Sequence, residues 1–379
     1  VARISVFHDG EMLFYRRLPS GASTMNLPLT TQGNVRWIPD GVPSLRHWGA
    51  ISDATMNPDG ITFTGTNCST QMTAMLHWAG ANGATKARIN TGRFYIEKST
   101  SGSGVLVSGT GSFELVGDGM FASTLYFADS ALSTGTARTL ISQNASTVLD
   151  FLRLADFGVV SDWGANGFWD DTSHAVSFGS DNRKVLVERV RFHNICQMCL
   201  VIANAQEVTV TDCHFDRSQR DGLHVVNASR LKISNNYFRQ VGDDSIVFSR
   251  TTEGYLPNQA IITGNIIEDS QGIYGTGYDS LIVSHNVVRR PHIRGIEIYR
   301  GEVWGDNRGR IARINYVITD NIVTDVFRRI RFGGAGKDLA YIGVGDVANP
   351  DYLNAIAEAK IAKLPLIHTA LGACEPAQT

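Results

Sequence analysis

Short runs of apolar residues recur along the middle of the chain and are separated by polar turn residues. Within residues 207–301, four runs resemble one another: Val208–Phe215, Arg230–Phe238, Ile261–Ile267 and Leu281–Val288. When the runs are aligned, one apolar position is filled by Leu152, Val187, Val210, Ile233, Ile262, Val283 and Ile318. The shortest gaps lie near 23 residues, and longer ones hold inserted loops. A repeat of this length indicates a stacked array of small structural units.

Each unit has the composition of β-strands. The runs are rich in Val, Ile, Phe and Thr, and none carries a helical period over ten residues. One unit alone cannot bury its apolar side chains, so neighbouring units must stack. The pattern therefore predicts an all-β fold, a right-handed single-stranded parallel β-helix or solenoid, over residues 46–334.

The segments that flank the repeat have other patterns. Residues 1–45 show only short apolar alternations and are expected to form a neck or connector. Residues 335–379, with a short Ala-rich helical segment at 350–363, are expected to form a C-terminal cap or a subunit contact. Residues 69–79 predict an N-terminal capping helix, with Ser69 or Thr70 as its N-cap. Its apolar stripe, which would cover the open end of the coil, comprises Met72, Met75, Leu76 and Trp78 or Ala79.

Composition and charge narrow the range of partners. The 379 residues carry a net charge of −2, which offers no electrostatic reason to expect a nucleic acid. No run of about 18 apolar residues is present, so no membrane insertion is predicted. The pair Cys196 and Cys199, with Cys213 nearby, is open to a zinc or redox interpretation. However, Cys213 occupies the repeat position that later units fill with asparagine, which favours inward-facing, stacked cysteines and no metal or cofactor.

The aligned units bring three aspartates together. In each unit a second strand begins with an inward-facing apolar residue. The residue two positions before it is, in successive units, Met198, Asp221, Asp244, Gln271 and Arg294. Parallel strands stack about 4.8 Å apart, so Asp221 and Asp244 should be near neighbours, with Asp243 beside them. Three carboxylates this close repel one another when ionised, which favours a proton on one of them. A general acid beside a general base is the resulting expectation.

Outward positions on the following strand add groups that suit a sugar chain. One column across the units reads Val201, His224, Val247, Tyr274 and Glu297, and the next ends in Thr276 and Tyr299. Aromatic rings can stack on the C–H faces of sugars, and carboxylates and hydroxyls can bond to sugar hydroxyls. The predicted substrate-binding residues are His224, Gln271, Tyr274, Arg294, Tyr299 and Trp304, the last from a nearby inserted loop.

The start of the repeat resembles the pectate-lyase-like β-helix family of phage tailspikes and related polysaccharide-degrading proteins. The likeness rests on Trp48-Gly49-Ala50, Asp59-Gly60, the capping helix, Gly92–Ile96 and Gly117-Asp118-Gly119. It implies a tailspike-like protein located in the virion, a homotrimer that contacts other virion proteins through its N-terminal segment. The implied ligand is a bacterial surface polysaccharide, a capsule or an O-antigen.

The aspartate motifs resemble those of polygalacturonase-like glycoside hydrolases. Gln219–Leu223 is similar to their Asn-Thr-Asp-Gly stretch, and Val241–Ile246 to their Gly-Asp-Asp-Cys-Ile. The resemblance implies that Asp244 protonates the leaving oxygen while Asp221 and Asp243 activate water, with inversion at the anomeric carbon. Ser270-Gln271-Gly272 and Glu297-Ile298-Tyr299 replace the basic motifs that hold a galacturonate carboxylate, so polygalacturonate is not the expected substrate.

Several alternatives stay open from the sequence alone. Glu297 is a rival catalytic acid or partner. Asp-Gly and Gly-Asp-Asp also occur in tight turns for structural reasons, so a non-catalytic spike or fibre that binds a glycan is the second hypothesis. A polysaccharide lyase is the third, because Arg294 with Tyr274 or Tyr299 offers a base and a cation.

Overall fold

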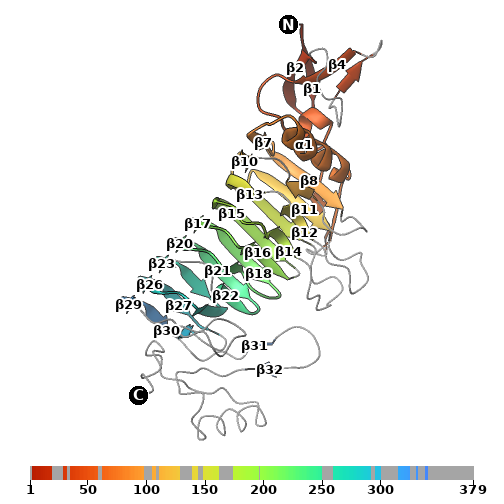
Figure 1. Ribbon diagram of the computed structural model, residues 1–379. Coiled ribbons are helices and arrows are strands. Elements are labelled where there is room, and N and C mark those ends of the chain that lie inside the picture. The colour runs from red at the N-terminus through yellow and green to blue at the C-terminus, as the bar shows by residue number, and fades with distance from the viewer. Residues whose placement is uncertain are drawn as a thin grey trace, which may run out of the picture.

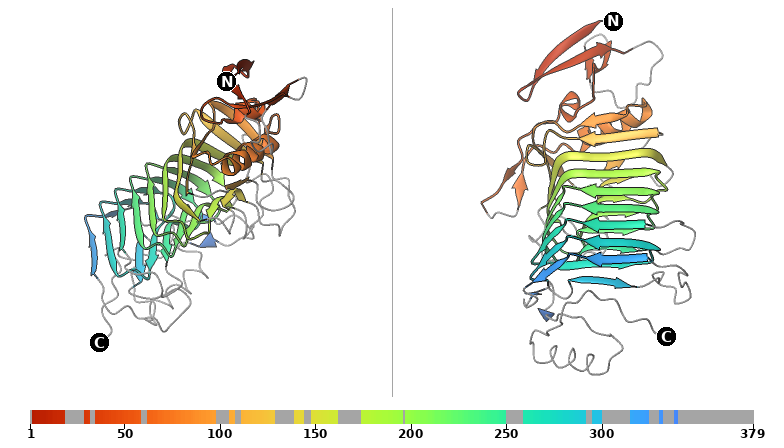
Figure 2. Two further views of the ribbon diagram at one scale, coloured as in Figure 1. Left: turned by 45° about the horizontal axis from the view of Figure 1, so that its top comes forward. Right: turned by 90° about the vertical axis from the view of Figure 1, so that its left-hand side faces the viewer.

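The structure is a computed structural model. It describes residues 2–18, 29–31, 35–58, 62–97, 105–107, 111–128, 139–143, 148–161, 174–195, 197–249, 259–291, 295–299, 315–324, 330–331 and 338–339. Most of these residues build an elongated stack of coils, with the N-terminus at one end and the later coils at the other (Figures 1 and 2).

Two parallel sheets run along the stack. The larger, of 16 strands, contains β7 (Lys86–Arg88), β8 (Gly92–Glu97), β10 (Gly111–Val116), β11 (Ser123–Ala128), β13 (Leu149–Ser161), β15 (Lys184–Ile195), β17 (Glu207–Thr211), β18 (His214–Ser218), β20 (Arg230–Ser234), β21 (Tyr237–Val241), β23 (Gln259–Thr263), β24 (Ile266–Glu268), β26 (Ser280–Ser284), β27 (Val287–Arg289), β29 (Asn315–Thr319) and β30 (Ile322–Thr324). The smaller, of 8 strands, contains β9 (Val105–Val107), β12 (Thr139–Gln143), β14 (His174–Phe178), β16 (Met198–Ala203), β19 (Leu223–Val226), β22 (Asp244–Ser249), β25 (Gln271–Thr276) and β28 (Ile296–Tyr299). This arrangement confirms the predicted parallel β-helix.

The repeat alignment is correct from Val187 onward. Val187 pairs with Val210, and the pairing continues through the later aligned positions to Ile318. Leu152 is an exception, because Leu154 and not Leu152 pairs with Val187. The first unit was therefore aligned two residues early, a shift that keeps the same side chains inward because strand side chains alternate with a period of two.

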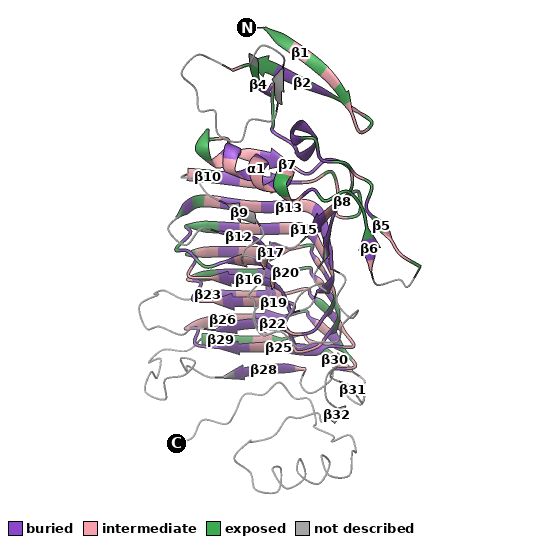
Figure 3. Ribbon diagram, turned by 90° about the vertical axis from the view of Figure 1, so that its right-hand side faces the viewer, coloured by how far each residue is buried: buried purple, intermediate pink, exposed green. Residues whose placement is uncertain are grey.

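Buried residues recur on the strands of successive coils along the stack (Figure 3). The rings of Phe192, Phe215 and Phe238 stack with centroid separations of 5.2 and 4.5 Å, and all three are fully buried. Close, nearly parallel rings of this kind fill the core without voids.

Asparagines form a ladder at one turn of the coil, and Cys213 occupies the equivalent position one coil earlier, as the sequence alignment predicted. The side-chain oxygens of Asn236, Asn265, Asn286 and Asn321 each accept the backbone N–H of the preceding ladder residue at 3.0 Å, beginning with that of Cys213. Cys213 is buried, and burial raises the pKa of its thiol to about 12. Burial likewise raises the pKa of the Cys199 thiol. Both thiols are therefore buried groups of the core, as the sequence predicted, whereas Cys196 lies outside the described residues.

The helix α1 (Ser69–Ala81) lies across the N-terminal end of the stack (Figure 1). Its buried residues are Met72, Met75, Leu76, Trp78 and Ala79, which confirms the capping stripe. The predicted N-cap was wrong. Cys68 occupies the cap position without a side-chain bond, and Asn67 Oδ1 accepts the Ser69 N–H at 2.9 Å.

The N-terminal segment forms an antiparallel sheet of β1 (Arg3–His8), β2 (Glu11–Arg17), β4 (Val35–Pro39) and β3 (Leu29–Thr31) in that order. Arg46, in the 3-10 turn η1 (Leu45–Trp48), joins this sheet to the stack through Asp9 (3.0 Å) and Glu11 (2.9 Å). Two short antiparallel pairs complete the elements: β5 (Thr55–Met56) with β6 (Phe63–Thr64), and β31 (Ile330–Arg331) with β32 (Asp338–Leu339). The helix predicted at 350–363 lies outside the described residues. No helix among those described is long and apolar enough to cross a membrane.

Candidate active site

The three aspartates lie where the chain passes from the larger sheet to the smaller one. Asp221 follows β18 and precedes β19, whereas Asp243 and Asp244 occupy the equivalent turn one coil later, with Asp244 opening β22. The turns pack closely: a Cβ added to Gly242 would lie 2.3 Å from the backbone oxygen of Gln219. Because only glycine fits there, the second turn can sit directly on the first.

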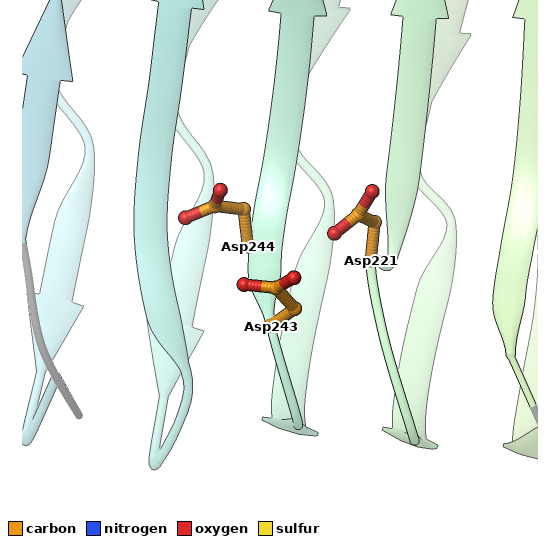
Figure 4. A group of neighbouring side chains, drawn as sticks. All are labelled: Asp221, Asp243 and Asp244. Atoms are coloured by element: carbon orange, nitrogen blue, oxygen red, sulfur yellow. The ribbon is translucent and has the colours of Figure 1, made fainter. Parts of the chain in front are cut away.

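This packing brings the carboxylates together, as the sequence predicted. One oxygen from each of Asp221, Asp243 and Asp244 lies within 4.8 Å of the others (Figure 4). Asp221 and Asp244 are 2% and 7% exposed, whereas Asp243 is half-buried. The cluster therefore presents Asp243 to solvent and holds the other two carboxylates beneath it.

Two neighbouring side chains orient the carboxylates. His224 Nδ1 lies 2.8 Å from Asp221 Oδ2, and the Gln271 side-chain N–H donates to Asp243 Oδ1 at 3.0 Å. Gln271 is also the strand partner of Asp244 on the next coil. His224 and Gln271, which the sequence assigned to substrate binding, thus contact the aspartates in this structure. The bonds limit the rotation of two of the three acids, which preorganises the cluster.

The outward column is also arranged as the alignment expected. Val201, His224, Val247, Tyr274 and Glu297 pair in succession across β16, β19, β22, β25 and β28. Tyr274 and Glu297 are half-buried and continue the row beyond the aspartates. Glu297 lies two coils past Val247, or about 10 Å at the usual strand spacing, so it is not a neighbour of the three carboxylates.

The remaining predicted site residues are less fully described. The backbone of Tyr299 pairs with Thr276, but its side chain is not among the described groups. Arg294 and Trp304 lie outside the described residues. Their assignment to substrate binding stays a prediction.

The three aspartates also form the one group of His, Cys, Asp and Glu, within the described part of the chain, whose spacing fits a metal ion. Carboxylate oxygens are the donors that Ca²⁺ and Mg²⁺ prefer.

Comparisons with known proteins address the fold. A family model described as the right handed beta helix region matches residues 164–326. The coil is a right-handed parallel β-helix. The match includes the aspartate turns and the strands from β14 to β30, and no curated protein matches the chain.

Solved structures show the same architecture at low identity. The catalytic domain of Agl-KA is 15% identical over 80% of this chain and 52% of its own, with a TM-score of 0.52. The catalytic domain of a GH87 alpha-1,3-glucanase in complex with tetrasaccharides is 15% identical over 76% of this chain and 49% of its own, with a TM-score of 0.50. The enzymatically active domain of bacteriophage CBA120 tailspike protein 2 is 12% identical over 85% of this chain and 54% of its own, with a TM-score of 0.47. The chain thus spans about half the length of each, and likeness at this level establishes the fold alone.

A side-chain contact on the larger sheet was missed from the sequence. His193 Nδ1, on β15, lies 2.8 Å from Asp216 Oδ2, on β18. Burial would raise the pKa of Asp216, but the hydrogen bond and charge of His193 together hold it below its usual value. The signal was available, because His193 and Asp216 are partners in the register of β15 and β18.

Proposed function

We propose that the chain binds a polysaccharide and hydrolyses its glycosidic bonds at Asp221, Asp243 and Asp244. The convergence of the three carboxylates, from two adjacent coils to within 4.8 Å, carries this proposal. Glycoside hydrolysis needs one carboxyl group that donates a proton and one carboxylate that acts on water or on the sugar. A right-handed β-helix accommodates such a ligand, since the GH87 glucanase of similar fold binds tetrasaccharides.

The proposed roles follow the burial of each group. Asp244, 7% exposed and beside two other carboxylates, holds the proton and transfers it to the leaving glycosidic oxygen. Asp243, the most exposed of the three, accepts a proton from the attacking water, with Asp221 adding negative charge. The water oxygen bonds to the anomeric carbon as the glycosidic C–O bond breaks, which releases a sugar with a new reducing end.

The spacing of the carboxylates constrains the geometry of the attack. Inverting enzymes usually separate their carboxyl groups by about 6.5–9.5 Å, with the water between them, whereas retaining enzymes use about 5–5.5 Å. The nearest oxygens here lie within 4.8 Å. Inversion, implied by the resemblance to polygalacturonases, therefore requires the water to lie beside the cluster and not between its members. NMR of the first anomer released decides between inversion and retention.

The substrate class and the biological setting belong to the same proposal. Tyr274 and Glu297 extend the outward row next to the cluster, and a sugar chain along this row would contact both. A bacterial capsule or O-antigen is the proposed polysaccharide, cleaved at the host surface by a tailspike-like protein of the virion. A homotrimer, and contacts with other virion proteins through the N-terminal segment, are further parts of this proposal.

Release of reducing ends tests the activity. Purified capsules and lipopolysaccharides are incubated with the protein, with Asp244→Asn, and with Asp212→Asn as a matched control at an exposed turn of a neighbouring coil. We expect reducing ends with the unsubstituted protein and the control, and a loss of about a hundredfold or more in Asp244→Asn. Equal rates in both variants would exclude Asp244 as the acid. Ultraviolet absorbance from an unsaturated product would identify a lyase instead.

Non-catalytic glycan binding is the second candidate. It is favoured by Asp221, a residue that is 2% exposed and whose carboxylate is bonded to His224, as expected of a group that stabilises a turn. A polysaccharide that the unsubstituted protein binds without releasing reducing ends or an unsaturated product would establish this role.

A further inference from the structure

A second set of rings lies on the outward side of the larger sheet, outside the aspartate site. Phe121, in the turn between β10 and β11, is 66% exposed. The turn lies close against Gly158, where an added Cβ would come within 2.7 Å of the Met120 backbone oxygen. The glycine thus lets the turn lie down on the sheet and carries Phe121 over the following coils.

Phe121 continues a row of planar groups that crosses three coils. Arg191, His214 and Tyr237 are neighbours in register on β15, β18 and β21. The Arg191 guanidinium lies 5.3 Å from the Phe121 ring centroid, and His214 meets the same ring edge-on at 6.1 Å. The rings of His214 and Tyr237 are 5.6 Å apart. We call Phe121, Arg191, His214 and Tyr237 the aromatic row.

Polar groups with fixed positions border the aromatic row. The Tyr237 hydroxyl donates to Glu268 at 2.9 Å, and the His193–Asp216 pair lies two residues further along the strands than Arg191 and His214. Arg289 bonds to the other oxygen of Glu268 at 3.0 Å. The surface therefore combines held rings with hydrogen-bonding groups at the spacing of successive coils.

We propose that the aromatic row is a second polysaccharide-binding surface, separate from the aspartates. Sugar rings expose C–H faces that stack on aromatic and guanidinium planes, and their hydroxyls bond to flanking carboxylates and imidazoles. Phe121 is fixed by Arg191 and His214 yet two-thirds exposed, so binding a sugar there costs little conformational entropy. His214 and Asp221 belong to one coil, and a long glycan can contact the row while another part of it reaches the aspartates.

The proposal that the aromatic row binds a polysaccharide rests on the proposed function. However, binding of a glycan to the row does not require that the glycan be cleaved. Binding is therefore measured in the Asp244→Asn background by biolayer interferometry. The probe is the tightest-binding member of an array of purified bacterial capsules and O-antigens. Phe121→Ala and Tyr237→Ala remove one ring each, and Phe121→Trp keeps a ring. Phe7→Ala is the matched control, because Phe7 is 70% exposed on the distant N-terminal sheet.

We expect Phe121→Ala and Tyr237→Ala each to weaken binding about tenfold, which corresponds to about 1.4 kcal/mol. Phe121→Trp and Phe7→Ala should bind like the background protein, and Phe121→Ala should keep its unfolding temperature because the Phe121 ring is largely exposed. Unchanged binding in Phe121→Ala and Tyr237→Ala overturns the proposal that the aromatic row binds polysaccharide. The proposed function still stands in that case, provided that the unsubstituted protein cleaves the array glycan. Weakened binding to a glycan that the unsubstituted protein does not cleave supports the row and overturns hydrolysis. Binding to no glycan on the array overturns both.

Discussion

Replacing Asn265 by alanine should remove the central link of the asparagine ladder. Asn265 is fully buried, its Oδ1 accepts both the backbone N–H and the side-chain N–H of Asn236 at 3.0 Å, and its own amide donates to the Ile233 oxygen at 3.1 Å. Alanine leaves the buried Asn236 N–H without this acceptor, at about 1–3 kcal/mol, and removes further bonds worth about 1 kcal/mol each. The expected loss in free energy of unfolding is about 3 kcal/mol.

Asn321→Ala supplies the comparison, because Asn321 makes the same bonds to Asn286 but is only half-buried in the last described coil. Water can replace its oxygen there, so we expect a loss of about 1 kcal/mol. Urea unfolding followed by circular dichroism measures both variants. Equal losses, or a loss below about 1 kcal/mol for Asn265→Ala, would show that buried amide bonds do not hold successive coils together.

Three further predictions concern the junction and the site. Burial lowers the pKa of His47 from 6.5 to about 4, so the folded state holds this side chain neutral where the unfolded chain would protonate it. The protein should therefore lose stability as the pH drops from 6.5 towards 4. The unfolding temperature of His47→Gln should depend less on pH in this window. Arg46→Met leaves Asp9 and Glu11 without their buried cation and should destabilise the N-terminal sheet by about 3–5 kcal/mol. Trypsin should then cleave faster after Arg16 or Arg17. An unchanged cleavage rate would contradict this prediction. Gln271→Ala removes the donor that orients Asp243 and should lower kcat about tenfold with little change in KM, whereas a change in KM alone would indicate a substrate contact.

The fold was predictable because the repeat carries its own register. Val210, Ile233 and Ile262 occur at equivalent places in runs that resemble one another, and inward residues of stacked coils must pair. The error at Leu152 arose where β13 is long and apolar, since alternation alone cannot distinguish two inward positions of one strand. The prediction of the helix cap was wrong because the capping side chain, Asn67, lies before the helix, where the helical pattern of apolar residues gives no information.

The site was predictable only where the repeat itself places residues together. The proximity of Asp221 and Asp244 follows from stacking, as does the pairing of Tyr274 with Glu297. The bond between His224 and Asp221 depends on side-chain rotamers, and the aromatic row depends on a turn that crosses Gly158. Neither follows from strand alignment.

The length of the ladder hydrogen bonds does not depend on how many residues separate the two partners along the chain. The residues that bond from Cys213 to Asn321 are 23, 29, 21 and 35 positions apart, yet each backbone bond measures 3.0 Å. A longer interval along the chain therefore does not alter the spacing of successive ladder residues. Descendants of such a chain can lengthen a connection between coils, or duplicate a whole coil, on an unchanged frame.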